Sequence, residues 1–120
     1  MTSTRQEKVK ELLKIEISEI IRREMNDPRL GFVTVTDAEV SPDLRHAKVF
    51  ISILGEQAQK DQGMKALKSA ASFIRTSFAK RANMKVTPEI VFLEDKVIER
   101  GSRIFELLEK MKKEDGGETP

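Results

Sequence analysis

The most distinctive set of potentially functional side chains is a basic stretch that contains no carboxylates. Residues 64–86 have no aspartate or glutamate but contain Lys65, Lys68, Arg75, Lys80, Arg81 and Lys85. Such cations bind phosphate oxygens, and each phosphate that they neutralise releases condensed counterions. The pattern therefore predicts either a surface that contacts nucleic-acid phosphates or a solvated basic helix face, and the spacing alone leaves both readings open.

Candidate catalytic and metal-binding groups are sparse. The chain has no cysteine and one histidine, which excludes disulfides, thiolate nucleophiles and sites built from several histidines. Glu94 and Asp95 could hold a magnesium ion, but neighbours on a strand point to opposite faces and no third ligand has a suitable spacing. His46, beside Arg45 and Lys48, is typical of a surface group. We therefore expect a protein that is not an enzyme and that uses no metal or cofactor.

Aromatic side chains give little support for base stacking. The chain has six phenylalanines and no tyrosine or tryptophan, whereas stacking platforms for RNA need exposed rings. Phe50 is the one candidate, on the polar side of an expected strand. An alternative function is thus a protein-interaction adaptor that uses an open sheet face around Phe50.

Near the end of the first expected helix, Asp27 is expected to pair with Arg29 or to cap a turn.

Length and composition indicate one ordinary domain. The 120 residues are 38% hydrophobic and 35% charged, which is typical of one folded domain. The net charge is only +2, so the overall charge does not by itself indicate a nucleic-acid partner. No apolar run approaches the roughly 18 residues of a membrane span, and the N-terminal region lacks the apolar core of a signal peptide. We expect a soluble, cytoplasmic protein with no membrane partner.

The N-terminal half predicts a helix and two strands. Apolar residues recur every three or four positions over residues 4–26, which predicts a helix that starts with a capping box at Thr4 or Ser3. Residues 32–40 read as a strand whose apolar phase changes, so a bulge or bend is expected near Asp37. Residues 46–53 alternate cleanly between apolar and polar positions and form the second strand of an antiparallel hairpin.

The C-terminal half predicts two helices, a strand and a last helix. Residues 56–85 keep helical phase, with a bend at Ala70-Ala71-Ser72 because the Ser72 hydroxyl could bond back to a carbonyl four residues earlier. Residues 89–94 are apolar on both faces, which suits a central or well-covered strand. A helix over 97–111 and a disordered charged tail over 112–120 complete the chain. The fold class is α+β, with a three-stranded sheet covered by helices on one face, in the order α-β-β-α-α-β-α.

The order of several short motifs resembles the bacterial ribosome-binding factor A family. The resemblance covers residues 5–111 and rests on Asp27-Pro28-Arg29, Val33-Thr34-Val35-Thr36, Val40-Ser41-Pro42-Asp43-Leu44, Ala47-Lys48-Val49, Ala70-Ala71-Ser72-Phe73-Ile74-Arg75, Thr87-Pro88-Glu89-Ile90, Phe92-Leu93-Glu94-Asp95, Glu99-Arg100-Gly101, Ile104 and Leu107-Leu108. It implies a single type II KH-like domain over residues 1–111. The family has an Ala-x-Gly kink between two helices, and here Ala70 is the alanine while Ser72 stands in place of the glycine.

The resemblance also implies a function. Members of this family are non-enzymatic factors that bind the free 30S small ribosomal subunit, assist late maturation of 16S rRNA near its 5′ end and support growth in the cold. We therefore expect a monomer that binds 16S rRNA, with other assembly factors such as a maturation GTPase as further partners. The expected central RNA contacts are Arg75, Lys80, Arg81 and Lys85, supported by Lys65, Lys68, Arg5, Lys8 and Arg22.

Overall fold

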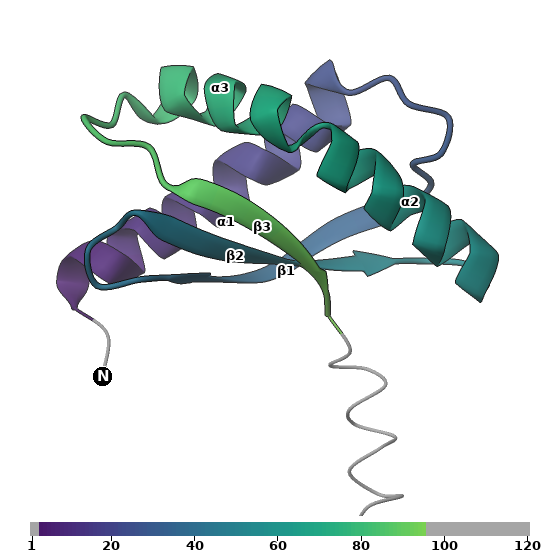
Figure 1. The fold of residues 1–120 in the computed structure, drawn as a ribbon, viewed down its shortest axis with the longest axis horizontal. Coiled ribbons are helices and arrows are strands. Elements are labelled where there is room, and N and C mark those ends of the chain that lie inside the picture. Colours follow the sequence, from purple (N-terminus) through teal and green to yellow (C-terminus); the bar gives the residue numbers. More distant parts are fainter. Residues whose placement is uncertain (1–2, 96–120) are drawn as a thin grey trace, which may run out of the picture.

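The computed structural model describes residues 3–95, so the helix expected over 97–111 and the tail expected over 112–120 lie outside the described residues. The described elements are α1 (Thr4–Glu24), β1 (Val33–Val40), β2 (His46–Ile53), α2 (Gln57–Ser69), α3 (Ala71–Ala82) and β3 (Glu89–Glu94) (Figure 1). The sheet order is β1-β2-β3, with β1 antiparallel and β3 parallel to β2.

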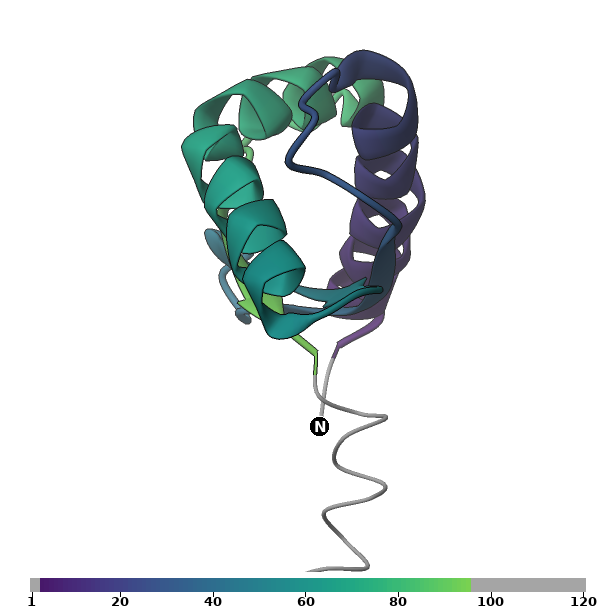
Figure 2. The ribbon, with the colours of Figure 1, turned by 90° about the vertical axis from the view of Figure 1, so that its right-hand side faces the viewer.

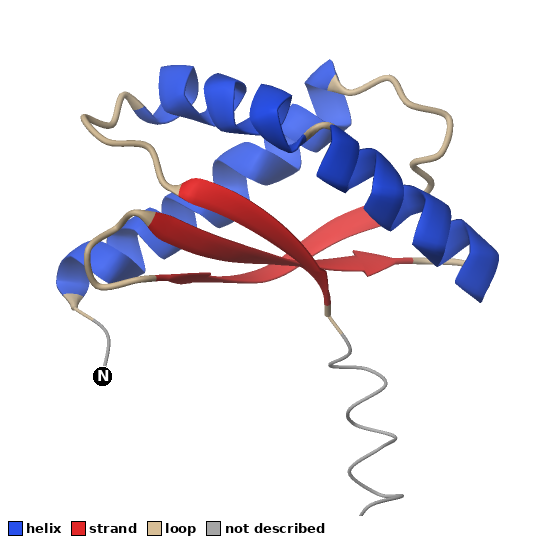
Figure 3. Cartoon of the chain, viewed as in Figure 1, coloured by secondary structure: helices blue, strands red, loops and turns tan. Residues whose placement is uncertain are grey.

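The three helices of the described residues lie on the same face of this sheet (Figure 2). Figure 2 shows α1 and α2 on opposite sides above the sheet, with α3 crossing between them at the far side, and Figure 3 shows α3 above the strands while α1 passes behind them. The core consists of the inward side chains of β2 together with the apolar face of α1 and residues from α2, α3 and β3. The predicted α+β architecture is confirmed for the described part of the chain.

Helix α1 begins with the second of the two predicted capping boxes. The Gln6 amide N–H donates to Ser3 Oγ at 3.1 Å, and the Ser3 N–H donates to Gln6 Oε1 at 2.8 Å. Buried Gln6 also donates from Nε2 to the Val40 carbonyl at 2.8 Å, which ties the start of α1 to the end of β1. The helix ends at Glu24, two residues before the predicted end, because Met25 is already extended.

The predicted irregularity in β1 is a bulge at Thr36. Val35 pairs with Ile51 and Asp37 pairs with Phe50, so Thr36 is the extra residue on β1. The insertion reverses the facing of the residues that follow, because side chains alternate along a strand. Ala38 and Val40 therefore point into the core, as buried residues.

Strand β3 differs from its prediction. It lies at the edge of the described sheet rather than at its centre. Ile90 and Phe92 are buried under the helices, whereas Val91 is 54% exposed and Leu93 is 36% exposed. The expectation of a central or well-covered strand was wrong, because these two residues lie on the face of the sheet that the described helices leave open.

The predicted bend between two helices is present, but its predicted cause is not. Ala70 forms the joint between α2 and α3, with φ −93° and ψ 5°. Within residues 3–95 the exposed Ser72 hydroxyl has no hydrogen bond, and the Ser72 carbonyl instead accepts one from the Thr76 hydroxyl at 3.0 Å. No residue of the joint has a positive φ, so the bend does not require the glycine that is usual in the related family.

Replacing Gln6 with leucine should destabilise the fold. The change removes the side-chain half of the capping box, in which Gln6 Oε1 accepts from the Ser3 N–H, and leaves the buried Val40 carbonyl without its donor, which costs about 2 kcal/mol. Urea denaturation should show a lower midpoint for Gln6→Leu. Glu11→Leu, at an exposed position of the same helix, serves as control and should change stability by less than about 0.5 kcal/mol. Equal midpoints for wild type and Gln6→Leu would contradict this role.

Replacing Ser72 with alanine should leave stability almost unchanged. The hydroxyl is exposed and unbonded in the described structure, so its loss should cost no more than about 0.5 kcal/mol. A decrease in the unfolding free energy of more than about 1 kcal/mol would show that this hydroxyl does hold the bend.

Candidate nucleic-acid interface

Three segments that are distant in sequence meet at one end of the molecule. They are the first turns of α1, the turn between β1 and β2, and the loop between α3 and β3, all at the left of Figure 1. Together they line a hollow of about 400 Å³, and its lining residues include Arg5, Lys8, Arg45 and Lys85. We call these four residues the basic end.

The basic end joins some predicted RNA contacts and adds one. Arg5, Lys8 and Lys85 were expected to contact RNA, and the fold brings all three together. Arg45 was not among the predicted contacts, because only the fold places the β1–β2 turn beside the loop that carries Lys85. Within residues 3–95 none of the four has an ion-pair partner, so their charges are free to meet phosphates.

The β1–β2 turn that presents Arg45 is held by a dense set of hydrogen bonds. Asp43 Oδ1 accepts from Ser41 Oγ at 2.6 Å and from the Arg45 N–H at 3.1 Å, and these bonds hold the pKa of Asp43 below its ordinary value. The Arg45 carbonyl accepts from the Glu89 N–H at 2.8 Å, which fixes the turn against β3. The position of Arg45 is thus set by the backbone around it.

Arg75 supports the loop that carries Lys85. Its Nε donates to the Pro88 carbonyl at 3.1 Å and its Nη2 donates to the Thr87 carbonyl at 2.9 Å. Two donors of the guanidinium are therefore used inside the protein. This residue, predicted as a central RNA contact, has a structural role that sequence reasoning missed.

Arg81 has acidic partners that the basic stretch itself lacks. It donates to Glu24 Oε2 at 2.8 Å and lies 3.3 Å from Glu16 Oε2, both on α1. The hydrogen bond from the Ser77 hydroxyl, followed by those from Arg81, holds the pKa of Glu24 below its ordinary value. Residues 64–86 contain no carboxylate, but the fold supplies Arg81 with two, because α1 packs against α3.

The remaining predicted RNA contacts lie outside the lining of this hollow. Lys80 is exposed in the last turn of α3. Lys65 and Lys68 are exposed on α2, which lies away from the basic end in Figure 1. Arg22 pairs with Glu19 at 2.7 Å. The structure thus separates the nine predicted cations into free charges at the basic end, free charges on the helices and internally paired arginines.

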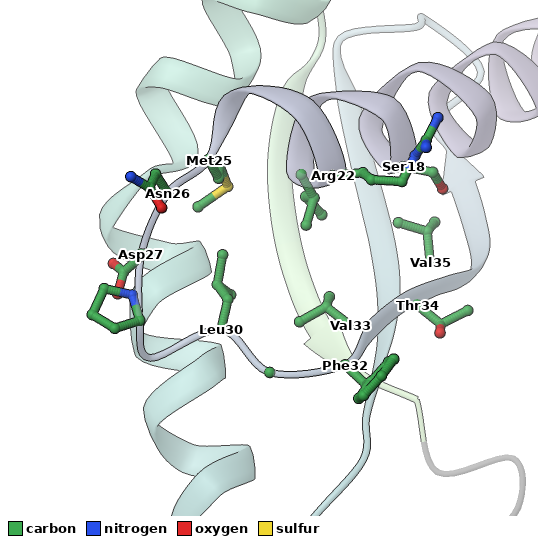
Figure 4. A pocket seen from close by; sticks show the side chains of 13 residues that line it. Ser18, Arg22, Met25, Asn26, Asp27, Leu30, Phe32, Val33, Thr34 and Val35 are labelled. Carbon is green, nitrogen blue, oxygen red and sulfur yellow. The ribbon is translucent and has the colours of Figure 1, made fainter.

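A second hollow, of about 720 Å³, lies between the last turns of α1, the segment before β1 and β1 itself. Figure 4 shows Met25, Leu30 and Val33 gathered around it, and Phe32 at its rim is 79% exposed. Arg22 also lines this hollow. Beside it, Asp27 pairs with Arg29 at 2.7 Å and caps the turn, as predicted. This hollow offers mainly apolar contact.

Asp95, His46 and Phe50 are the remaining residues that the sequence offered as candidates for metal binding or partner contact. Asp95 accepts a hydrogen bond from the Thr36 hydroxyl, and no group of three metal-ligating side chains occurs among the described residues. His46 is exposed, with its Nδ1 3.9 Å from Glu89 Oε2. Phe50 is half-buried on the open sheet face, in register with Leu93. No helix within residues 3–95 has the length and apolar character needed to span a membrane.

The Glu24 cluster should make stability depend on acidic pH. The pKa of Glu24 lies below its ordinary value of 4.5 in the folded protein, so its ionised form stabilises the fold above pH 4.5, and this contribution disappears as the pH falls through the folded value. Glu24→Gln should therefore lower the urea midpoint at neutral pH and reduce its decline below pH 4.5. Glu39→Gln, an exposed change on β1, is the control. If the urea midpoint of Glu24→Gln fell below pH 4.5 as steeply as that of the wild type, this role would be contradicted.

Comparisons with known proteins identify the relatives of this chain. The family model described as ribosome-binding factor A matches residues 5–108. Ribosome-binding factor A of Halothermothrix orenii is 49% identical over 96% of this chain and 94% of that protein. Its counterpart in Heliobacterium modesticaldum is 45% identical over 100% of this chain and 99% of that protein.

Solved structures give the same relation. The crystal structure of ribosome-binding factor A from Thermus thermophilus has a TM-score of 0.66 and 26% identity, covering 74% of this chain and 94% of that one. A homology model of the Thermus thermophilus factor, fitted into a cryo-EM map of a complex with the 30S subunit, has a TM-score of 0.61 and 27% identity, covering 70% of this chain and 88% of that one. The family match and the near full-length relatives together show that this chain belongs to the ribosome-binding factor A family.

Proposed function

We propose that this protein binds the free small ribosomal subunit and assists late maturation of 16S rRNA near its 5′ end, with a role in growth in the cold. Family membership supports this proposal, as does the complex of a Thermus thermophilus relative with the 30S subunit. The protein acts as a monomer, by binding and by biasing the conformation of the RNA, and makes no covalent change.

The single observation that carries the proposal is the basic end. Arg5, Lys8, Arg45 and Lys85 come from three segments and surround one hollow, without acidic partners among residues 3–95. Cations grouped in this way can meet several phosphates at once. Lys80, Lys65 and Lys68 are exposed but lie on the helices, outside the lining of the hollow. We therefore propose that they make peripheral contacts with the RNA.

The internally bonded arginines contribute indirectly. Arg75 holds the loop carbonyls of Thr87 and Pro88, and Arg81 is paired with Glu16 and Glu24. Reversal of either charge would disturb the fold as well as any RNA contact. Direct tests of RNA binding should therefore use the free cations of the basic end.

Phosphate contacts determine how strongly this surface binds, whereas the folded rRNA determines where it binds. Lysine and arginine read the position of the RNA backbone and carry little base information. Specificity for the free subunit then depends on an arrangement of phosphates that exists there and is covered or altered in the complete ribosome. A factor of this kind leaves the subunit when that arrangement changes.

Binding to free small subunits should depend strongly on salt and on the basic end. If about four phosphates are engaged, the affinity should fall about a hundredfold between roughly 50 and 200 mM salt. The double variant Lys8→Glu with Lys85→Glu should lose co-sedimentation with free small subunits at moderate salt. The matched variant Lys65→Glu with Lys68→Glu makes the same change in net charge on α2 and should lose much less.

The same sedimentation assay separates the proposal from the adaptor alternative. Equal loss in the two double variants would mean that net charge alone decides binding. Retained binding in the basic-end variant, together with loss in Phe50→Ala, would assign the contact to the open sheet face and contradict the proposal. Circular dichroism melting curves should confirm that all variants remain folded, because surface charges contribute little to stability.

The maturation role predicts a defect in cells. Deletion of the gene should slow growth in the cold and should raise the fraction of 16S rRNA that keeps extra nucleotides at its 5′ end. Primer extension measures this fraction. Expression of the wild-type chain or the α2 variant should reverse both defects, whereas the basic-end double variant should not. Normal 5′ ends in the deletion strain at low temperature would contradict the maturation role.

A further inference from the structure

The hollow at the basic end has an apolar floor beneath its charged rim. Val9 and Leu44 are core residues, 8% and 9% exposed, whereas Met84 is half-buried and Val86 is 52% exposed, so Met84 and Val86 supply most of the accessible apolar lining. The rim consists of Arg5, Lys8, Arg45 and Lys85, with Asp43 as the one acidic residue of the lining. A purely phosphate-binding surface has no need of such a floor, so this combination points to a ligand with both apolar and anionic parts.

Asp43 contributes one negative charge to a lining that has four positive ones. Its Oδ1 is engaged by the Ser41 hydroxyl and the Arg45 N–H, at 2.6 and 3.1 Å, so this oxygen serves to shape the turn. With four basic residues and one acidic residue, the lining keeps a net formal charge of +3. The rim favours an anion, and two or more phosphates could be held on different sides of the opening.

The walls of the hollow are held in place before any ligand binds. Leu44, one of the lining residues, adopts a left-handed conformation with φ 61°, and Asn83 at the end of α3 has φ 52°. Such conformations are uncommon for residues other than glycine and persist only where the surroundings impose them. Hydrogen bonds from Glu89 to the Arg45 carbonyl and from Arg75 to the Thr87 carbonyl hold the two loops. The hollow is thus a formed site rather than a gap between mobile loops.

We infer that this hollow receives the base of one unpaired nucleotide of RNA, with the adjacent phosphates on the basic rim. A volume of about 400 Å³ lies within the range of sites for small ligands, and such sites combine an apolar lining with a few polar groups. The apolar floor would cover the faces of a base that has left its stack, as occurs in single-stranded RNA recognition. This inference rests on the proposed function and specifies the kind of RNA that the same site takes.

The site would give the protein a way to prefer single-stranded RNA over duplex. A paired base cannot reach the floor, because it remains stacked inside the helix. Phosphate contacts alone would bind single-stranded RNA and duplex RNA alike, because both present a charged phosphate backbone. The apolar floor therefore supplies selectivity that the cations cannot.

The inference is tested with short RNA probes in a fluorescence anisotropy titration. The probes are labelled hexauridylate, the same hexamer without bases, and a duplex of equal strand length. The wild-type protein should bind hexauridylate about tenfold more tightly than the abasic hexamer, a factor that corresponds to about 1.4 kcal/mol of binding free energy. Equal affinity for the two single-stranded probes would overturn the inference.

Matched variants separate the floor from the rim. Val86→Ser, at a side chain that is 52% exposed, and Met84→Gln keep every charge and should abolish the preference for hexauridylate over the abasic hexamer. Arg45→Gln should weaken both probes by the same factor. A preference that survives both floor variants would overturn the inference, and unchanged melting temperatures for Val86→Ser would show that the loss is not due to unfolding.

Two further measurements distinguish this inference from the proposed function. If the wild-type protein sediments with free small subunits but binds both single-stranded probes equally, the base site is contradicted and the proposed function still stands. Wild-type protein that fails to sediment would remove the proposed function itself. An unlabelled acidic peptide with apolar side chains is the competitor, and tighter binding of this peptide than of hexauridylate would assign the hollow to a protein partner and overturn the inference.

Discussion

Strand β2 has hydrogen-bonded neighbours on both of its sides, and the packing of the described molecule depends on which of its faces is buried. Ala47, Val49, Ile51 and Ile53 point under the helices, and a shift of one residue would turn all four outward. The bulge at Thr36 keeps the apolar residues of β1 in phase with this face despite their irregular spacing. Once β2 is set, the turn before it and the start of β3 beside it must lie at the same end of the sheet as the start of α1, and this places the basic end.

The positive charges of the chain differ in function according to their neighbours. Arg81 faces Glu16 and Glu24 across the contact between α1 and α3, and Arg75 closes the loop before β3 through two carbonyls. These arginines stabilise the arrangement of helix and loop. The cations of the basic end have no such partners among residues 3–95, so their electrostatic free energy is available to a ligand. A nearly neutral protein can thus present one strongly basic site.

Much of the fold follows from patterns within single segments, whereas the site does not. Alternation predicted β2, phase change predicted the bulge near Asp37, and helical periodicity predicted two helices with a joint near Ala70, all of which the structure contains. The apolar run of β3 predicted a central or well-covered strand, whereas Val91 and Leu93 lie exposed on a strand at the edge of the described sheet. Sequence reasoning also could not separate free from paired arginines or connect Arg45 with Lys85, since these properties arise only when distant segments meet.

The central claim is that the basic end is the surface that meets ribosomal RNA. It is consistent with a family of factors named for ribosome binding, and it assigns a common purpose to the three segments that form the hollow. The most direct measurement is a cryo-EM map of this protein bound to the free small subunit, at a resolution that shows side chains. The account predicts that Arg45 and Lys85 face rRNA phosphates. The account would be contradicted by a map in which Arg45 and Lys85 face solvent while the subunit contacts the open sheet face around Phe50 or the second hollow beside Phe32.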